Sequence, residues 1–238
     1  MNLRSLTRRW WQDVVRARRP RTRLSLEPVE DRVVPAFDLS LSNAATVGVT
    51  QNDAAGTRTF IATATGANLD WADVAIALNN NLDVVVSNGN TGAENGDITD
   101  STGAQLPILN NKTITIQSDP GATVGAITLQ DIALNGLGEN LVIKAKGDLQ
   151  TGSLSAGLLA NPTPLPSMAL SSTNGAITGG ALHATNLALD AKTGIGTTAL
   201  PVSTVAINLV ARTQSGDLAI DNAVGLNIGF AGQPFAGL

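Results

Sequence analysis

Cysteine and tyrosine are missing from this 238-residue chain, which also contains only one His, four Phe and three Trp. Without cysteine there are no disulfides, no thiolate nucleophile and no Cys-ligated zinc. With so little aromatic volume, the apolar core has to be built from Ala, Val, Ile and Leu. Such side chains suit thin, regular layers better than a thick globular centre. Hydrophobic residues still make up 43% of the chain, enough for a sizeable core.

Charge is scarce and unevenly distributed. Charged residues make up 14% of the chain, against about 25% in an ordinary soluble domain. Residues 1–35 hold nine Arg and four acidic residues, whereas the rest of the chain holds six basic and fifteen acidic residues. The basic first segment and the acidic body are therefore interpreted separately. The acidic body offers no basic groove, so nucleic acid is not expected as a partner.

The first segment has helical spacing up to a proline. Leu3, Leu6, Trp10 and Val14 recur among arginines, and Pro20 follows. This pattern predicts either a short basic amphipathic helix, which would lie on an anionic membrane surface, or a disordered basic arm. Neither a membrane-spanning run of about 18 apolar residues nor a secretory apolar stretch accompanies it. Transient contact of this segment with a membrane or with export machinery is the expected role.

A short motif follows, RLSLEPVEDRVVPA, from Arg23 to Ala36. It resembles the "R-L-x-L-E-x-L-E-D-R-x-V-P-A" segment that begins many large, repetitive, exported proteins of planctomycete-type bacteria. Val29 stands where that pattern has Leu, and Pro28 falls at one of its variable positions. The resemblance implies export to the cell surface or the extracellular space, and it implies no catalysis. It also divides the chain into a targeting or sorting segment, 1–36, and a folded repeat domain, 37–238.

The body of the chain repeats a six-residue pattern. Each copy has apolar residues at its second and fourth positions and a small residue at its sixth, and a glycine follows within a few residues. The copies are Thr113–Ser118, Asn140–Ala145, Ser167–Ser172, Asn186–Ala191 and Ala206–Ala211, with an earlier member aligned on Val84. The following glycines are Gly121, Gly147, Gly175, Gly194 and Gly216.

The repeat spacing predicts one coil of a β-solenoid per copy. The first apolar positions of the copies are Ile114, Leu141, Met168, Leu187 and Ile207. They lie 19 to 27 residues apart, enough for two or three short strands whose inward side chains stack on the next coil. A β-sandwich is the competing fold, because it also shows short alternating strands. The solenoid is favoured, since the one Trp of the body, Trp71, falls in an expected helix rather than in a strand.

Residues 69–99 carry a second resemblance. Residues 69–78 predict a short helix with Asp70 as its N-cap. They precede LDVVVSNGNTGAENGDIT, which begins at Leu82. Together they resemble the helix and the "N-V-x-V-S-T-G-N-x-G-x-x-N-G-D-I-T-V" stretch of filamentous-haemagglutinin-like adhesins. The resemblance implies a right-handed parallel β-helix, an all-β fold, of the secreted-adhesin type. It also implies a cell-surface or extracellular-matrix polysaccharide or protein as partner.

Catalytic and metal-binding patterns are few. His183 stands without a second His, a Cys or a Glu pair, so a solvent-facing or turn position is expected. Asn95–Asp97 with Asp100, or Asp217 with Asp221, could supply oxygen ligands to calcium, but turn-forming side chains explain the same residues. No catalytic, cofactor-binding or metal-binding residue is therefore assigned, and no cofactor is expected.

Two functions remain open. The favoured one is an exported structural or adhesive cell-surface β-helix protein without catalytic activity. The alternative is a carbohydrate-active β-helix enzyme, similar to a polysaccharide lyase or hydrolase. A cleft with three converging carboxylates and a basic residue would favour the enzyme, and a smooth face of Thr, Asn and Ser would favour the structural role. The ending Gly229–Leu238 shows no polar cap, so we expect the chain to be either a truncated product or the first part of a longer repetitive protein.

Overall fold

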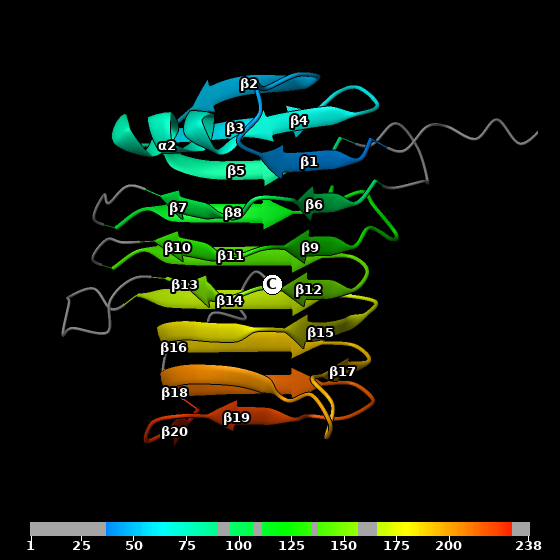
Figure 1. The fold of residues 1–238 in the computed structure, drawn as a ribbon, viewed down its shortest axis with the longest axis vertical. Helices are drawn as coiled ribbons and strands as arrows, with labels where there is room; N and C mark the ends of the chain where they lie inside the picture. The colour runs from blue at the N-terminus through cyan, green and yellow to red at the C-terminus, as the bar shows by residue number, and fades with distance from the viewer. Residues whose placement is uncertain (1–36, 90–95, 107–110, 135–137, 157–165, 230–238) are drawn as a thin grey trace, which may run out of the picture. The chain divides into compact units, whose positions relative to one another are not determined.

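Short alternating segments stack into a parallel β-solenoid of about six turns (Figure 1). The computed structural model describes residues 37–89, 96–106, 111–134, 138–156 and 166–229, all of which belong to one unit, Val34–Leu238. Successive turns place their strands on three faces that run along the solenoid axis. The predicted solenoid is confirmed. The basic segment 1–36 and the motif within it lie outside the described residues.

Face 1 is a seven-stranded sheet. Its strands are β1 (Leu39–Ser42), β4 (Ala67–Asp70), β6 (Ile98–Asp100), β9 (Ile127–Leu129), β12 (Leu149–Thr151), β15 (Ala176–Gly179) and β17 (Gly194–Ile195). Each ladder in this sheet is parallel. Inward aliphatic side chains occupy equivalent positions in successive turns, and all are buried: Ile98, Ile127, Leu149, Ile177 and Ile195.

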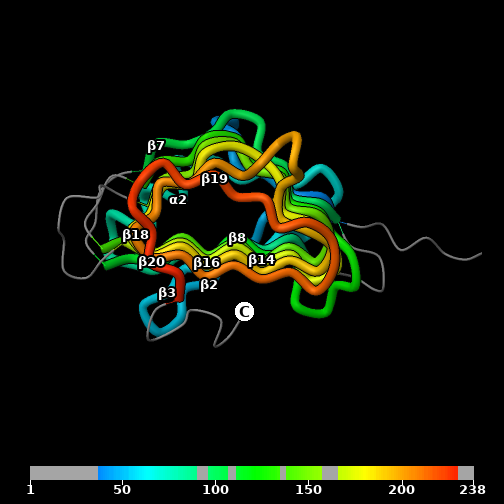
Figure 2. Tube along the Cα trace, turned by 90° about the horizontal axis from the view of Figure 1, so that it is seen from below, coloured from blue at the N-terminus to red at the C-terminus, as the bar shows by residue number. Residues whose placement is uncertain are grey.

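Faces 2 and 3 belong to one sheet, because two long strands run through both. Face 2 contains β7 (Ala104–Leu106), β10 (Ile132–Leu134), β13 (Leu154–Ser155), β19 (Ile220–Asn222) and the first parts of β16 (Ala181–Ala191) and β18 (Val202–Thr213). Face 3 contains β3 (Thr57–Ala62), β5 (Asp83–Ser87), β8 (Thr113–Gln117), β11 (Asn140–Ala145), β14 (Ser167–Ser172), β20 (Asn227–Ile228) and the second parts of β16 and β18. Figure 2 shows the turns superimposed along the axis.

Parallel pairing excludes the β-sandwich alternative. Among the described strands, the one antiparallel ladder joins β2 (Val49–Ala54) to β3, and every other ladder is parallel. A sandwich of the immunoglobulin type is built from antiparallel sheets instead. Face 3 shows the stacking most clearly. Val84, Ile114, Leu141, Met168 and Leu187 follow one another in register, and all are at most 2% exposed.

The last predicted repeat has the wrong register. The sequence pattern aligned Ile207 with Leu187, but Leu187 pairs with Leu209. Leu209 is 6% exposed, whereas Ile207 points outward and is 41% exposed. The strand turns the corner between faces 2 and 3 at this point. The inward alternation runs through Ala206 and resumes at Leu209, so Ile207 falls on the corner.

The N-terminal end of the solenoid is covered by a hairpin and a helix (Figure 1). Strand β2 lies outside β3, and most of its residues are exposed. Helix α2 (Trp71–Asn79) begins after Asp70, whose side chain accepts from the Ala72 N–H at 2.9 Å. The predicted helix and its N-cap are therefore confirmed. No helix in the described part of the chain is long and apolar enough to cross a membrane.

Glycine is required at the corners for two different reasons. Gly216 has φ +78°, in the region that favours glycine, as the sequence predicted. Gly175 is needed for close packing instead, since a Cβ there would lie 2.6 Å from the backbone nitrogen of Asp148 in the previous turn. The coils thus approach each other too closely at some corners for any side chain.

Candidate functional site

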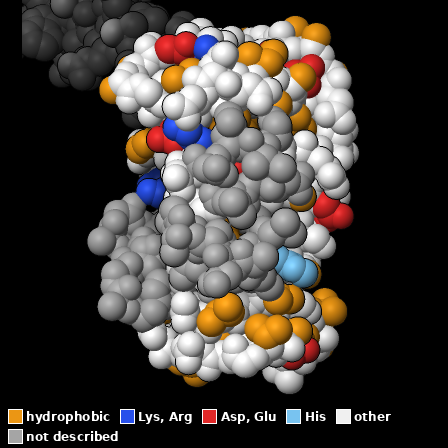
Figure 3. Space-filling view, turned by 90° about the vertical axis from the view of Figure 1, so that its left-hand side faces the viewer, with side chains coloured by type: hydrophobic (Ala, Val, Ile, Leu, Met, Phe, Trp, Pro, Cys, Tyr) orange, Lys and Arg blue, Asp and Glu red, His pale blue; other side chains and the backbone are white. Residues whose placement is uncertain are grey.

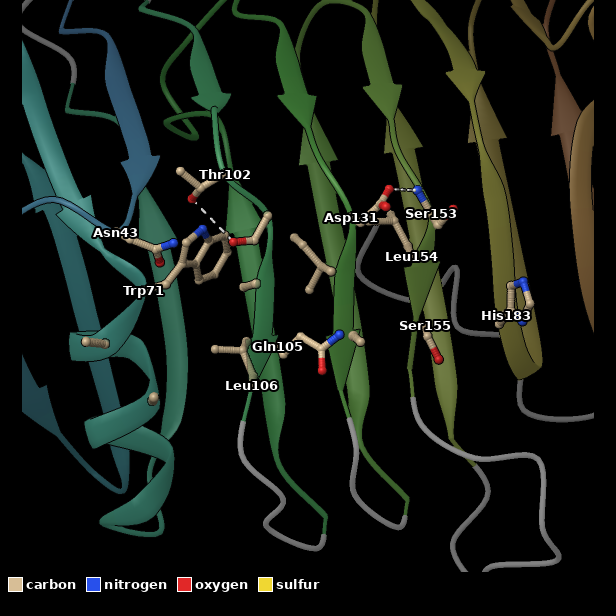
Figure 4. Close-up of a pocket in the computed structure, with 16 residues that line it drawn as sticks. Asn43, Trp71, Thr102, Gln105, Leu106, Asp131, Ser153, Leu154, Ser155 and His183 are labelled. Carbon is tan, nitrogen blue, oxygen red and sulfur yellow. Dashed lines mark hydrogen bonds between the residues drawn. The ribbon is translucent and has the colours of Figure 1, made fainter.

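A groove of about 800 Å³ lies on the outer surface of face 2 (Figure 4). Trp71 and Ala75 of α2 line its N-terminal end, β7, β10 and β13 line its middle, and His183 on β16 lines its far end. Figure 3 views this side of the solenoid, where the single histidine is visible at the surface. The volume lies within the range of about 300–1,000 Å³ that small-molecule sites occupy.

A row of outward side chains runs along the groove. Gln105 pairs with Ala133, Ala133 with Ser155, and Ser155 with His183. Gln105 is exposed and the other three are partly exposed. Because paired strands lie about 4.8 Å apart, the row spans about 14 Å along the solenoid axis. The groove therefore runs across the strands, from one turn to the next.

One edge of the groove is fixed by hydrogen bonds at the turn between faces 1 and 2. The Asp131 carboxylate (Oδ1) accepts from the Ser153 N–H at 2.7 Å, and the Asp131 carbonyl accepts from the Ala104 N–H at 2.9 Å. Asp131 thereby joins three successive turns. This edge should hold its shape, because side chain and backbone both restrain it.

The N-terminal end of the groove is anchored by a buried contact. The indole N–H of Trp71 donates to Oδ1 of Asp100 at 3.2 Å, and both residues are at most 3% exposed. The same oxygen accepts from the Thr102 and Gly103 N–H groups, and Oδ2 accepts from the Gln130 N–H. A buried carboxylate is stable where it gains several such bonds. Asp100 therefore attaches α2 to the first turns of face 1.

The groove carries little charge. Among the described residues that line it, Asp131 is the one carboxylate, and no Lys or Arg is present. Ion pairs lie elsewhere, between Arg58 and Asp53 and between Arg212 and Asp190. The Arg58 guanidinium lowers the pKa of Asp53 by a direct hydrogen bond. The hydrogen bond from Arg212 to Asp190 raises the pKa of Arg212.

Several aspartates connect one turn to the next. In each case a carboxylate oxygen accepts a backbone N–H from the following turn, at 2.7 to 3.2 Å. The pairs are Asp83 with Thr113, Asp97 with Ala126, Asp100 with Gln130, Asp131 with Ser153, and Asp148 with Ala176. These side chains are thus engaged in building the solenoid and do not converge on one point.

His183 and the residues considered as calcium ligands do not form a common site in the described part of the chain. His183 is solvent-facing as predicted, although it lies within strand β16 and not in a turn. Of the first calcium candidate, Asn95 lies outside the described residues, and Asp97 and Asp100 accept backbone N–H groups. No group of three His, Cys, Asp or Glu side chains in the described part of the chain could hold a metal ion.

The groove could not be found from sequence motifs. Gln105, Ser155 and His183 belong to different turns, and their common row depends on strand pairing. No local pattern marks them, and the usable signal would have been correct alignment of the face 2 strands. Comparison of the chain with protein-family models, with curated proteins and with solved structures finds no match. The function is therefore inferred from the residues and their geometry.

Proposed function

We propose that this protein is an exported structural or adhesive element of a cell surface, without catalytic activity. The observation that carries this proposal is a row of uncharged polar side chains on the outer surface of face 1. The row runs in register through five turns: Ser40, Thr99, Thr128, Gln150 and Thr178. This row carries no charge, and it fits contact with a matrix or with another surface better than catalysis.

A second row supports a rigid structural role. On face 3, Asn186 donates to Ser167, Asn208 donates to Asn186 at 2.7 Å, and Asn227 donates to Asn208 at 3.3 Å. Stacked amides of this kind stabilise parallel, in-register strands. Each turn contacts mainly its neighbours, so the stack extends without a central globular core. A rod of this type suits a spacer that presents a surface at a distance from the cell.

The alternative of a carbohydrate-active enzyme has less support. Such an enzyme would need clustered carboxylates and a base in one cleft. In the described part of the groove, the one carboxylate, Asp131, is bonded to the Ser153 N–H. No Lys or Arg of the described residues lines the groove. Catalysis is therefore the second candidate, carried only by the presence of a groove.

Export is proposed from the resemblance of Arg23–Ala36 to the segments that begin exported repetitive proteins. The adhesin-type resemblance of residues 69–99 supports the same location, and its helix and strands form as expected. The basic segment would contact a membrane or the export machinery only during transfer. The partner of the mature surface would be a polysaccharide or a protein outside the cell.

Fractionation of the native cells tests the proposal. We expect the full-length protein in the surface or extracellular fraction, digestible by protease added to intact cells. Replacing Glu30 and Asp31 with Ala should retain the protein inside the cell, and replacing the exposed Thr99 with Ala should leave its location unchanged. Recovery of the unmodified protein in the cytoplasm would contradict export. Hydrolysis or elimination products from a polysaccharide panel would contradict the absence of catalysis.

A further inference from the structure

The groove on face 2 must recognise its ligand through side chains. Strand β10 pairs with both β7 and β13, and β13 pairs with both β10 and β16. The backbone groups of β10 and β13 are therefore used within the sheet. An extended peptide cannot be added as a further strand at β10 or β13, which is the usual way in which a sheet binds a peptide. Strand β7 is the last strand of the sheet, and α2 contacts it.

The side chains of the row are suited to hydroxyl groups. A glutamine amide, a serine hydroxyl and a neutral imidazole each combine donor and acceptor capacity. Gln105, Ser155 and His183 offer these groups in a line, and Ala133 leaves a gap between the first two. A sugar hydroxyl is likewise both donor and acceptor. The small apolar surfaces of Ala75 and Ala133 lie beside these polar groups, which matches the mixed polarity of a sugar ring.

Length and charge restrict the ligand further. The row spans about 14 Å across four paired strands, so it fits an extended chain better than a single small molecule. Asp131 at the edge repels anions, and no basic side chain of the described lining compensates for it. Phosphate-rich or uronate-rich polymers are therefore poor ligands for this groove.

We propose that the groove binds an extended, uncharged oligosaccharide, laid along the solenoid axis from Trp71 to His183. Gln105 and His183 bind hydroxyl groups at the two ends, and Ser155 binds one between them. Trp71 is buried and shapes the end of the groove through its bond to Asp100, without stacking on the sugar. This inference depends on the proposed surface function for its biological setting, and it names the partner as an uncharged glycan.

Isothermal titration of the full chain with defined hexamers tests the inference. The uncharged probes are cellohexaose, xylohexaose and mannohexaose, and the charged probe is hexagalacturonate. We expect at least one uncharged hexamer to bind about tenfold or more tightly than the charged one. Gln105→Ala and His183→Ala should each weaken that binding about tenfold, because each removes hydrogen bonds from one end of the row.

Two further variants separate binding from folding. Gln214→Ala is the matched control, because Gln214 is an exposed glutamine in the turn after β18 and does not line the groove, and binding should stay within about twofold. Ala133→Leu fills the gap in the row at a partly exposed position, and it should weaken binding about tenfold while the circular dichroism spectrum stays unchanged.

Three results would overturn the glycan proposal. They are failure of all three uncharged hexamers to bind at millimolar concentration, equal losses in Gln105→Ala and Gln214→Ala, and equal binding of an uncharged Gly-Ser hexapeptide. These results leave the cell fractionation untouched. A surface-located protein that binds no hexamer would retain the proposed function and lose only this ligand.

Discussion

The indole N–H of Trp71, in α2, donates to the buried carboxylate of Asp100, in β6, which lies 29 residues later in the chain. Asp100 accepts three more backbone N–H groups, from Thr102, Gly103 and Gln130. One carboxylate therefore fixes the start of α2, the turn after β6 and the end of β9. It is also the point at which the covered end of the solenoid joins the repetitive turns.

Replacing Asp100 with Ala should lower the free energy of unfolding by about 3 kcal/mol or more, because several N–H donors would lose their acceptor. Replacing Trp71 with Phe removes one donor and keeps most of the ring, so it should cost about 1–2 kcal/mol. Urea titration followed by circular dichroism measures both losses.

Thr99→Ala serves as the control for this contact. Thr99 lies in the same strand as Asp100 but is exposed, so its replacement should change stability by less than about 0.5 kcal/mol. A loss at Thr99 as large as that at Asp100 would show that the buried carboxylate has no special part in stability.

The register of β18 leads to an independent test. Leu209 is buried beside Leu187, so Leu209→Ala should cost about 2 kcal/mol or more through lost burial and a new cavity. Ile207 is on the corner and largely solvated, so Ile207→Ala should cost less than about 0.5 kcal/mol. Chemical denaturation compares the free energies of unfolding of the two variants. A larger loss for Ile207→Ala would support the register that the sequence pattern predicted.

The stacking of the turns could be predicted because inward positions such as Ile114, Leu141 and Met168 recur with the same local pattern. The position of Ile207 could not be predicted, since a corner resets the alternation and no residue type marks where the corner falls. The groove could not be predicted from the sequence for a related reason. Gln105 and His183 share a row only through two intervening strands, and the turns that join these strands differ in length.

Two of the aspartates considered as calcium ligands accept hydrogen bonds between turns of the solenoid. Asp97 and Asp100 stand in a turn-like sequence that resembles an oxygen-rich loop, but their carboxylates accept backbone N–H groups of the next turn. A short sequence window shows only the turn. It does not show the N–H groups that the following turn, about 30 residues later, brings to it.

The ion pair between Asp53 and Arg58 predicts a small dependence of stability on pH. Arg58 donates to both carboxylate oxygens and lowers the pKa of Asp53. A carboxyl group whose pKa is lower in the folded state stabilises the fold above its unfolded pKa, and that contribution is lost as the pH falls through the folded pKa. Asp53→Asn should therefore lower the melting temperature at about pH 7 and not at about pH 2.

Two variants control this prediction. Arg58→Gln should give the same pattern. The double variant should lower the melting temperature about as much as one single variant, because either substitution alone already breaks the ion pair. The pair is exposed, so about 1 M salt should reduce the difference at neutral pH. Equal melting-temperature losses at both pH values would show that the ion pair does not cause the effect.

The corner glycines give the sharpest matched pair in the chain. A Cβ on Gly216 would lie 1.8 Å from the carbonyl oxygen of Thr193, and φ there is +78°. Gly225, nine residues later, has nothing within 4 Å of the same atom. Gly216→Ala should therefore cost about 2 kcal/mol or more, from backbone strain and from separation of two turns. Gly225→Ala should be neutral or stabilise slightly, since alanine restricts the unfolded chain. Urea titration measures the free energy of unfolding of both variants. Similar losses would contradict the prediction that close contact between turns excludes a side chain at Gly216.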